Sequence, residues 1–589
     1  MTHVFNDPAR FADELVEGLV AANRSRIVQV EGGVIRRHRA PSNSVVMVTG
    51  GGSGHYPAFG GLVGQGIAHG AAMGNVFASP SADQICAVAR AVNAGGGILL
   101  CYNNYAGDVL NFDEAQRRLR AQGLDVRSVV VNDDVASAPL AEAQRRRGIA
   151  GSFAVFKAAG FACDSGASLD EVMRIAAAAN ERVRSVGVAF SGCTLPGASA
   201  PLFEVERGQM EVGMGIHGEP GLERRPAPTA HALAQLLVER LLAEVPSVVR
   251  SVEGSRVAAI LNGLGAVKYE ELFVVFRSVD RLLTERGITL VEPEVGELVT
   301  SFDMAGVSLS LAWLDEEFER SWCAAADTPA FRKGSVARAT GELAGGASQR
   351  TSRVVAQGTA ESRAAAAVAL EALRAGSRAI RARSDELGRL DAVAGDGDHG
   401  IGMQHGATAA VEAAEQALAA SAGVGTLLAT AGEAWSHRGG GTSGALWGVL
   451  LREFGRALGD ERAPDLAGVA AAADAALSAV SAAGHARVGD KTMVDAMDPF
   501  ARELAQAVAD GMPLRTAWSQ AAHAATAAAQ ATAALLPKLG RARPHAQRSV
   551  GTPNPGAVSM VLVLEAVAEI LAQRTCAWLD PISAPQRGE

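Results

Sequence analysis

The feature that most constrains the fold of this 589-residue chain is a change of sequence texture near residue 330. Before it, short β-branched and other apolar runs alternate with segments of helical periodicity. After about residue 361 the strand-like runs give way to alanine-rich segments with leucine and valine at helical spacing. The first pattern is typical of α/β proteins and the second of helical bundles. A chain of this length also exceeds what one core normally supports, so we expect two folded halves.

Strands and helices of the two halves can be predicted individually. In the first half, buried strands are expected over 45–49, 97–100, 128–131, 186–190 and 257–261, with helices over 81–93 and 169–183 among them. In the second half, helices are expected over 362–380, 406–420, 468–483, 513–536 and 558–571. Between the halves, 328–358 is rich in Gly, Ser, Thr and Arg, which indicates a linker. We therefore predict an α/β domain over 1–330, a linker over 331–360 and an all-α domain over 361–575.

Composition narrows the possible partners and the compartment. The net charge of −9 argues against nucleic acid or an anionic membrane as partner, but not against a nucleotide, whose charge a metal neutralises locally. Six cysteines without C-x-x-C spacing indicate reduced thiols rather than disulfides or zinc. The start of the chain lacks the pattern of a secretory signal, and no apolar run approaches the ~18 residues of a membrane span. We expect a cytoplasmic protein with no membrane partner.

Three carboxylates lie within eight residues in Asp391-Ala-Val-Ala-Gly-Asp396-Gly-Asp398, with one glycine before Asp396 and one between the last two aspartates. Such a cluster repels itself unless a cation lies among it. Oxygen ligands suit Mg²⁺, whose coordination substrate phosphates often complete. A solvated turn explains an isolated D-G-D equally well. Further glycine-rich segments downstream favour a Mg-nucleotide site.

Two segments that follow predicted strands carry candidate catalytic groups in the first half. Strand 45–49 runs into Gly50-Gly-Gly-Ser-Gly54-His55-Tyr56-Pro57, where glycines let the backbone approach a small ligand and His55 supplies a titratable group. The next strand leads into Asn103-Asn-Tyr-Ala-Gly-Asp108, which places a carboxylate where a general base belongs. A tight turn with an incidental histidine and a structural aspartate turn remain alternatives.

A third segment, Val212-Gly-Met-Gly-Ile-His217-Gly-Glu-Pro-Gly221, contains G-x-G-x-x-G. We reject a dinucleotide site, because that fingerprint must open a helix and here Gly-Glu-Pro-Gly follows at once. What remains is a histidine on a rigid glycine-rich loop, able to act as base, ligand or nucleophile. Metal binding is disfavoured because the other histidines show no ligand spacing.

Segments that suit phosphates recur in the second half. Arg438-Gly-Gly-Gly-Thr442-Ser443-Gly444 precedes a helical pattern, and a glycine-rich turn with hydroxyls at a helix start is a good phosphate cradle. Gly489-Asp-Lys491 adds a cation, and Gly540-Arg541-Ala-Arg543, which Thr552-Pro-Asn-Pro-Gly556 follows, adds two more. A helix cap or surface loop explains each of them equally well alone. The Walker A and protein-kinase motifs are missing from the sequence, so we expect a nucleotide site at one end of a helical bundle.

Together these segments resemble one family, the single-chain ATP-dependent dihydroxyacetone kinases. The shared blocks are G-G-S-G-H, N-Y-x-G-D, G-M-G-I-H-G-E-P-G, D-x(4)-D-G-D-x-G, G-G-T-S-G, G-D-K-T-M and G-R…P-G-A, in the order of the family. The resemblance spans about residues 10–330 and 361–570. It implies a ketose-binding α/β half with two α/β subdomains and an eight-helix nucleotide-binding half. It also implies a small ketose and ATP as substrates, two Mg²⁺ ions and a homodimer.

The resemblance further implies roles for individual residues. His217 corresponds to the histidine whose ring nitrogen adds to the substrate ketone to give a covalent hemiaminal. His55 and Asp108 correspond to the groups that hydrogen-bond the captured substrate and take the proton from the attacking hydroxyl. The residues implied to line the sugar pocket are Gly52, Ser53, Gly54, His55, Asn103 and Asp108. Those implied to hold Mg²⁺ are Asp391, Asp396 and Asp398. Those implied to contact the nucleotide are His399, Gly400, Ile401, Gly402, Thr442, Ser443, Gly489, Asp498, Arg541, Asn554, Pro555 and Gly556.

Three positions depart from the family pattern. Tyr56 replaces the glutamate of G-H-E-P, and Asn103 replaces a lysine ahead of N-Y-x-G-D, so the polarity of the sugar pocket is expected to differ. The G-H-Y-P-A-F variant resembles the branch that acts on erythrulose, a four-carbon ketose, which favours D- or L-erythrulose over dihydroxyacetone. Asn554 replaces the usual aspartate near the nucleotide.

Other activities of the same architecture remain alternatives. In one, the helical half holds ADP permanently and a phosphotransferase-system protein rephosphorylates it. That arrangement usually keeps the halves as separate chains, so their fusion here favours exchangeable ATP. A second alternative is a cyclase or lyase acting on flavin dinucleotide. A third is a catalytically silent ketose-binding regulator, which the intact set of aspartates disfavours.

Overall fold

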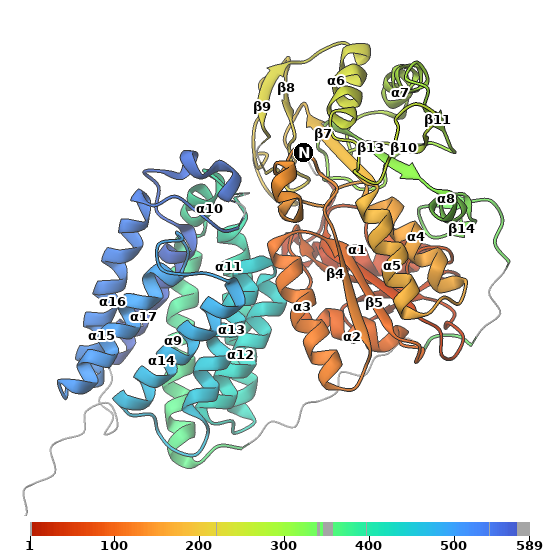
Figure 1. Ribbon diagram of the computed structural model, residues 1–589. Helices are drawn as coiled ribbons and strands as arrows, with labels where there is room; N and C mark the ends of the chain where they lie inside the picture. The colour runs from red at the N-terminus through yellow and green to blue at the C-terminus, as the bar shows by residue number, and fades with distance from the viewer. Residues whose placement is uncertain are drawn as a thin grey trace, which may run out of the picture. The chain divides into compact units, whose positions relative to one another are not determined.

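The computed structural model describes residues 3–219, 221–337, 342–345, 357–395, 397–540 and 542–573 (Figure 1). The chain divides into two compact units, Met1–Arg350 and Thr351–Glu589, which are described separately. The first unit contains two mixed sheets with helices, and the second consists of packed helices. The predicted division into an α/β half and an all-α half is confirmed.

The first sheet of the α/β unit has six strands in the order β1-β2-β4-β3-β5-β6. Strands β3, β4, β5 and β6 run parallel, and the β1–β2 hairpin joins β4 in antiparallel fashion. The strand bounds are β1 Ile27–Val30, β2 Gly33–Arg36, β3 Val46–Ser53, β4 Gly70–Val76, β5 Ile98–Asn103 and β6 Val126–Val131. Helices α2 (Ala82–Val92) and α3 (Ala106–Ala121) share one apolar core with the sheet. Helices α1 (Phe11–Ala22), α4 (Ser152–Asp164) and α5 (Leu169–Glu181) share another.

The second sheet has seven strands in the order β11-β10-β13-β7-β8-β9, with β12 paired to β10. Its strands are β7 Val183–Ala189, β8 Gln209–Val212, β9 Glu223–Pro226, β10 Arg256–Gly263, β11 Thr289–Leu290, β12 Glu294–Gly296 and β13 Gly306–Leu314. Helices α6 (Ala230–Leu242) and α7 (Tyr269–Thr284) pack on it through a separate apolar core. Helix α8 (Glu316–Cys323) and the short β14 (Ala326–Asp327) and β15 (Arg332–Lys333) complete the unit. The two expected α/β subdomains therefore correspond to these two sheets.

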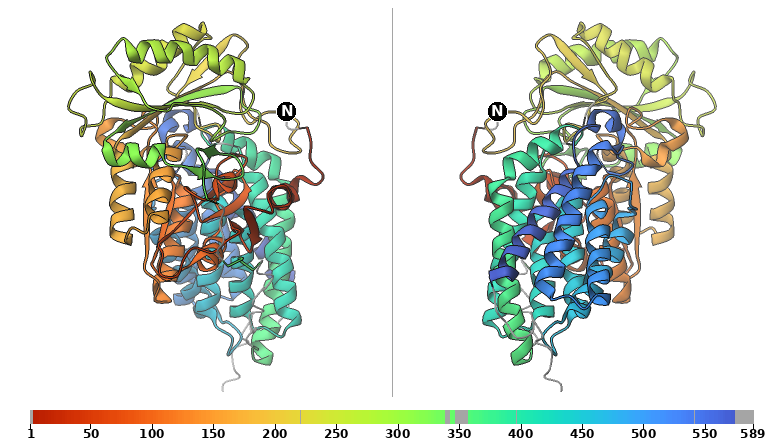
Figure 2. Two further views of the ribbon diagram at one scale, coloured as in Figure 1. Left: turned by 90° about the vertical axis from the view of Figure 1, so that its right-hand side faces the viewer. Right: turned by 90° about the vertical axis from the view of Figure 1, so that its left-hand side faces the viewer.

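The second unit contains eight helices of 16 to 23 residues in its described part, and Figure 2 shows that they run side by side. These are α9 Ala360–Ala382, α11 His399–Ala419, α12 Val424–Gly439, α13 Gly441–Leu458, α14 Leu466–Gly484, α15 Val494–Ala509, α16 Leu514–Ala531 and α17 Pro555–Gln573. The nine-residue α10 (Ser384–Ala392) links α9 to α11. Alanine dominates the core, because small side chains let neighbouring helices approach closely.

Two helices of this unit differ from the expectation about apolar runs. By length and composition, α14 and α17 are apolar enough to cross a membrane, with mean hydropathy of 1.6 and 1.8 over an 18-residue window. The expectation that no segment is apolar enough to span a membrane was wrong here. Alanines raise the mean hydropathy of a helix without forming a run that stands out in the sequence as strongly apolar. Both helices contribute to the core of the helical unit, through residues such as Val469, Val480, Met560 and Leu564. The buried helices of a soluble bundle satisfy the same test.

Candidate active site

Two histidines from distant parts of the sequence meet in the α/β unit. His55 lies just after β3, and His217 lies in the loop after β8. Their Nε2 atoms are 3.0 Å apart, and the two rings are nearly perpendicular. Both side chains are buried. The structure thus brings together two residues that the sequence identified separately.

Aromatic rings surround the two imidazoles. The Phe77 ring stacks on His55 at a centroid distance of 4.9 Å, and the Tyr105 ring lies 4.6 Å from that of His217. Phe302 packs against Phe77 at 5.2 Å. Gly54, with φ +113°, permits this arrangement because a Cβ there would come within 2.5 Å of the Phe302 ring. These rings form an apolar enclosure, and electrostatic interactions are stronger in an apolar surrounding than in water.

Each imidazole is oriented through its other nitrogen. His55 Nδ1 lies 2.8 Å from the carbonyl oxygen of Thr300. His217 Nδ1 lies 3.2 Å from Glu219 Oε1, and the backbone N–H of His217 donates to Glu219 Oε2 at 3.1 Å. These contacts leave the Nε2 atoms facing one another. Glu219 was not identified from the sequence, although it lies in the G-E-P-G that follows His217.

Polar groups on β5 and α3 complete the buried site. Asn103 ends β5 with 2% exposure, and Asp108 lies in the first turn of α3 and is also buried. Neither side-chain atom of the Asn103 amide nor the Tyr105 hydroxyl has a hydrogen-bond partner among the described residues. Leaving a buried polar group unpaired costs about 1–3 kcal/mol. A small polyhydroxylated ligand would supply the missing partners.

The remaining predicted sugar-pocket residues shape the backbone of this region. The predicted glycine loop is part of β3, which continues to Ser53. The Ser53 hydroxyl donates to the Gly74 carbonyl at 2.7 Å, and a Cβ at Gly52 would come within 2.7 Å of the backbone at Phe77. Tyr56, by contrast, is 42% exposed, and its ring packs over Gly61. Of the two departures expected at the sugar pocket, Asn103 is therefore the buried one.

In the helical unit, two of the three aspartates expected to hold Mg²⁺ lie in the described residues. Asp391 belongs to the last turn of α10, and Asp398 precedes the first residue of α11. Asp391 Oδ2 accepts a hydrogen bond from Gly397 N at 2.9 Å, which orders the turn between the two helices. Asp396 lies outside the described residues, and within them no group of three His, Cys, Asp or Glu side chains is placed to hold a metal. The half-buried carboxylates of Asp391 and Asp398 supply the oxygen donors that fit Mg²⁺.

His399 connects three helices next to this turn. Its Nδ1 lies 3.2 Å from Ser443 Oγ on α13, and its Nε2 lies 3.0 Å from Ser559 Oγ on α17. Burial lowers the pKa of His399, and Asp391 partly opposes this effect. The neutral ring thus holds together the ends of α11, α13 and α17.

The glycines that follow His399 allow close helix contact. A Cβ at Gly400 would come within 1.9 Å of the Ser384 carbonyl, and one at Gly402 within 3.2 Å of the Gly439 carbonyl. Ile401 is 46% exposed. Nucleotide contact by these three residues remains a prediction.

The glycine-rich turn before α13 has the geometry of an anion site. Gly440 and Gly441 have positive φ values of 57° and 58°, and the helix begins at Gly441. Thr442 and Ser443, both half-buried, lie in the first turn. The free N–H groups and partial positive charge of a helix N-terminus favour phosphate.

The contacts of Lys491 differ from those expected of a cation that binds phosphate. Its side chain is buried, and Nζ donates to the carbonyls of Leu535 and Ser549 and to the Ser549 hydroxyl at 3.1, 2.7 and 3.1 Å. Burial lowers the pKa of this ammonium group. All three donors of the ammonium are used, so Lys491 holds two chain segments together.

Other predicted nucleotide contacts are also engaged within the chain. Gly489, with φ +91°, donates its N–H to Asp495 Oδ1 at 2.6 Å. Asp498 on α15 forms an ion pair with Arg502 at 3.0 Å. Arg541 lies outside the described residues.

Asn554 has a structural role that explains why an amide stands there. Its Oδ1 accepts from Ala557 N at 2.9 Å, which caps α17, and its Nδ2 donates to the Lys491 carbonyl at 2.9 Å. Pro555 begins the helix, and a Cβ on Gly556 would come within 3.1 Å of Asn554 Oδ1. An aspartate could cap the helix but could not donate to the carbonyl.

Replacing Lys491 with methionine is expected to destabilise the helical unit by about 2–4 kcal/mol, because two buried carbonyls and a hydroxyl lose their donor. Thermal unfolding of the full chain followed by circular dichroism measures the effect. The control is Lys538→Met, which removes a lysine that is 63% exposed and pairs with Asp490. Equal unfolding midpoints for Lys491→Met and Lys538→Met would contradict the structural role.

Comparisons with known proteins cover nearly the whole chain. A family model described as the Dak1 domain matches residues 17–330, and one described as the DAK2 domain matches residues 393–569. The chain is 56% identical over 576 residues to a protein named L-erythrulose kinase from Pectobacterium atrosepticum, covering 98% of this chain and 97% of that protein. It is 50% identical over 580 residues to a D-erythrulose kinase from Mycolicibacterium smegmatis, covering 98% and 99%.

A solved structure shares this organisation. The dihydroxyacetone kinase from C. freundii in complex with AMP-PNP and Mg²⁺ is 30% identical, with a TM-score of 0.51. The match covers 96% of this chain and 99% of that chain.

Proposed function

Because the chain belongs to the family of single-chain dihydroxyacetone kinases that combine a Dak1 with a DAK2 domain, we propose that it transfers the terminal phosphoryl group of ATP to a hydroxyl of erythrulose. The observation that carries the proposal is its near-full-length similarity to erythrulose kinases. The buried histidine pair beside unpaired polar groups supports a small ketose as acceptor.

In the proposed mechanism, His217 captures the ketose covalently. Nε2 of His217 adds to the ketone carbon and gives a hemiaminal. This step suits an acceptor that is small and uncharged, because ordinary contacts with such a molecule offer limited affinity. An alcohol such as glycerol has no carbonyl to add to, so capture also selects the substrate. His55, whose Nε2 lies 3.0 Å from that of His217, would hydrogen-bond the oxygen of the captured ketone.

Asp108 is the proposed general base. It is buried at the start of α3, directly after the strand that ends in Asn103. A carboxylate there can accept the proton of the terminal hydroxyl as that oxygen attacks phosphorus. Capture by His217 fixes the same hydroxyl, and positioning supplies much of the catalysis of phosphoryl transfer.

The helical unit is proposed to hold the nucleotide. Asp391 and Asp398, with Asp396, would ligate two Mg²⁺ ions, which neutralise the phosphate charge when bound. The first turn of α13, with Thr442 and Ser443, would receive phosphate oxygens on its free N–H groups. His399 would fix the position of that turn through its contact with Ser443.

Asn103 supports erythrulose over dihydroxyacetone as the acceptor. Erythrulose carries one more carbon and one more hydroxyl than dihydroxyacetone. The neutral Asn103 amide can both donate and accept a hydrogen bond, and no described residue pairs with it. The additional hydroxyl of a four-carbon ketose would satisfy this amide.

A coupled assay that detects ADP tests the proposal. The purified full chain is incubated with ATP, Mg²⁺ and one acceptor at a time: L-erythrulose, D-erythrulose, dihydroxyacetone or glycerol. We expect turnover with erythrulose at the highest kcat/KM, less with dihydroxyacetone and none with glycerol. Activity that appears only after a phosphotransferase-system protein is added would overturn the proposal. Equal rates with glycerol would overturn selection through the carbonyl.

A further inference from the structure

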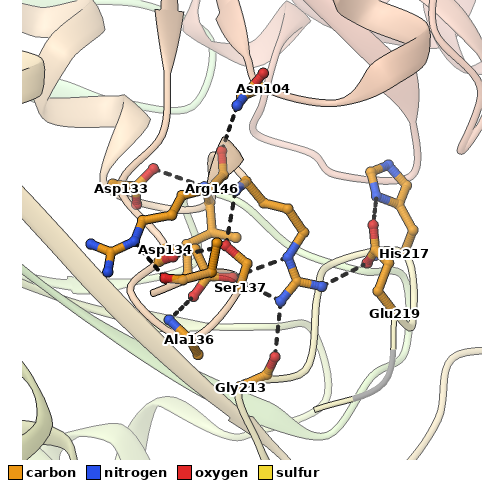
Figure 3. Close-up of polar contacts among 12 residues, drawn as sticks. Asn104, Asp133, Asp134, Ala136, Ser137, Arg146, Gly213, His217 and Glu219 are labelled. Carbon is orange, nitrogen blue, oxygen red and sulfur yellow. Dashed lines mark hydrogen bonds and ion pairs between the residues drawn. The ribbon is translucent and has the colours of Figure 1, made fainter. Parts of the chain in front are cut away.

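A row of three charged side chains, Asp134, Arg147 and Glu219, leads to His217 of the histidine pair, and Figure 3 labels Asp134, Glu219 and His217. Arg147 donates from Nε and Nη2 to Asp134 Oδ2 at 3.1 and 2.9 Å. Its Nη1 lies 3.8 Å from Glu219 Oε2. Glu219 in turn contacts the backbone N–H and Nδ1 of His217.

The backbone is shaped to permit this row. Gly215 leaves room for this contact, because a Cβ there would come within 2.0 Å of Glu219 Oε2 and 2.4 Å of Arg147 Nη1 and would displace these side chains. The Gly213 carbonyl accepts from Arg147 Nη2 at 2.9 Å. Asp134 also accepts from Ala136 N at 3.0 Å, so its carboxylate is fixed from both sides. The three side chains of the row lie inside the protein, so they differ from an exposed ion pair on the surface.

Counting hydrogen-bond donors assigns the protons on the histidine pair. The Thr300 carbonyl can only accept, so His55 Nδ1 carries a proton. As a carboxylate 3.8 Å from the Arg147 guanidinium, Glu219 can only accept, so His217 Nδ1 would carry a proton as well. The contact between the two Nε2 atoms requires a third proton. Three protons on four ring nitrogens amount to one imidazolium charge shared by the pair.

We propose that Asp134, Arg147 and Glu219 are positioning residues that keep one positive charge on the His55–His217 pair, so that the shared proton is ready for the ketone oxygen. The formal charges support this assignment. Two carboxylates and one guanidinium sum to −1, and the imidazolium brings the buried set to zero. Within this row each buried charge has a neighbour of opposite sign, which offsets the cost of burying it.

Burial and neighbouring charges set the protonation of three groups in or next to the row, Tyr105, Cys193 and Arg147. Tyr105, from the start of α3, stays neutral, because burial and then Glu219 raise its pKa well above the usual range. Burial also raises the pKa of the Cys193 thiol to about 12, so it remains protonated. Burial opposes the charge of Arg147, but Asp134 and Glu219 outweigh it and raise its pKa.

Three carboxyl groups complete this environment. Burial raises the pKa of Asp134, and Arg147 opposes the effect. Burial raises the pKa of Asp133 to about 6, and its carboxyl is turned to the backbone N–H groups of Ile149 and Gly151. Asp108, on α3, is the remaining carboxylate on the substrate side. It belongs to the general-base step proposed above.

The inference rests on the proposed function, because the proton is used during covalent capture. As Nε2 of His217 forms its bond to the ketone carbon, the π electrons of the carbonyl move to oxygen. That oxygen takes the proton from Nε2 of His55. His55 becomes neutral, and the alkylated His217 ring becomes the imidazolium. The charge of +1 is conserved, and Glu219 remains its counter-ion throughout.

The experiment follows capture directly with the full chain and erythrulose labelled with ¹³C at C2, in the absence of ATP. Carbon NMR over a pH series measures how much label moves from the ketone to the tetrahedral region. Capture should fall at high pH once the pair has lost its shared proton, because His55 then has no proton to give. In Glu219→Gln the imidazolium loses its counter-ion, so the midpoint should move down by about one pH unit or more. The affinity for erythrulose should fall about tenfold or more.

A second variant and a matched control make the result specific. Asp134→Asn removes one negative charge farther along the row and should move the midpoint in the same direction by less. Glu244→Gln breaks the neighbouring buried ion pair with Arg146, whose Nη2 lies 2.8 Å from Glu244, and should leave the midpoint unchanged.

The outcomes separate the two proposals. A tetrahedral signal in the wild type with an unchanged midpoint in Glu219→Gln overturns this inference and leaves covalent capture standing. An equal shift in Glu244→Gln overturns it as well. If Glu219→Gln does not fold, an unchanged midpoint in Asp134→Asn is decisive against it. The lack of any tetrahedral signal in the wild type removes covalent capture, and the inference with it.

Discussion

Replacing His217 with alanine is expected to reduce kcat/KM for erythrulose on the order of 10³-fold or more, which corresponds to about 4 kcal/mol of transition-state stabilisation. The cause is loss of the covalent bond that holds the ketose and orients its terminal hydroxyl. Because capture also selects the carbonyl, the preference for erythrulose over glycerol should collapse in this variant. Steady-state kinetics with both acceptors and saturating Mg-ATP measures both effects.

The control for this substitution is His231→Ala, which removes an exposed histidine at the start of α6. It should leave the rate and the acceptor preference unchanged. Binding of AMP-PNP with Mg²⁺ to His217→Ala, followed by calorimetry, should match the wild type, since the substitution lies in the α/β unit. A His217→Ala enzyme that still strongly prefers erythrulose to glycerol would show that selectivity does not depend on the covalent bond.

Replacing Asp108 with asparagine is expected to lower kcat by about 10²- to 10⁴-fold, the usual contribution of a positioned general base. Asparagine has nearly the same shape but cannot take the proton from the attacking hydroxyl. Covalent capture should persist, because His217 and Glu219 are untouched. The variant should therefore show near-normal formation of the ¹³C-labelled adduct together with a low rate of ADP formation.

Asp113→Asn provides the matched control on the same helix. Asp113 accepts a hydrogen bond from the Tyr102 hydroxyl at 3.2 Å and has no proposed role in the reaction. Its substitution should leave kcat close to the wild-type value. A near-normal kcat in Asp108→Asn would contradict the assignment of the base, whereas loss of the adduct in that variant would place Asp108 in capture instead.

Much of the fold was predictable because its elements carry local signals. The strand predicted at 257–261 lies within β10, and the helix predicted at 169–183 corresponds to α5, whose N-terminus is a capping box of Ser168 and Glu171. By contrast, β13 was missed although it lies between β7 and β10 in the second sheet. Its Gly306 start and alternating serines weaken the apolar run. Only pairing with strands far away in sequence makes it a central strand.

The residues of the candidate site could be proposed from the sequence, but the contacts between them could not. His55 and His217 were identifiable from their glycine-rich surroundings, yet their contact depends on how two different sheets meet. Glu219 and Arg147 were missed because a carboxylate after a histidine and an arginine in a loop are common features of surfaces. Lys491 was misread for the opposite reason, since its glycine-rich neighbourhood suggests a ligand whereas its partners Leu535 and Ser549 lie 44 and 58 residues away. Burial is a property of the assembled chain and has no local signature.

The ammonium group of Lys491 links the segment that precedes α15 to the backbone at Leu535 and Ser549. This link would couple the thermal stability of the helical unit to the nucleotide site proposed there. Any modification that removes the positive charge of Lys491, such as acylation, should therefore first destabilise the helical unit. Weaker binding of ATP should follow only as a consequence of that destabilisation.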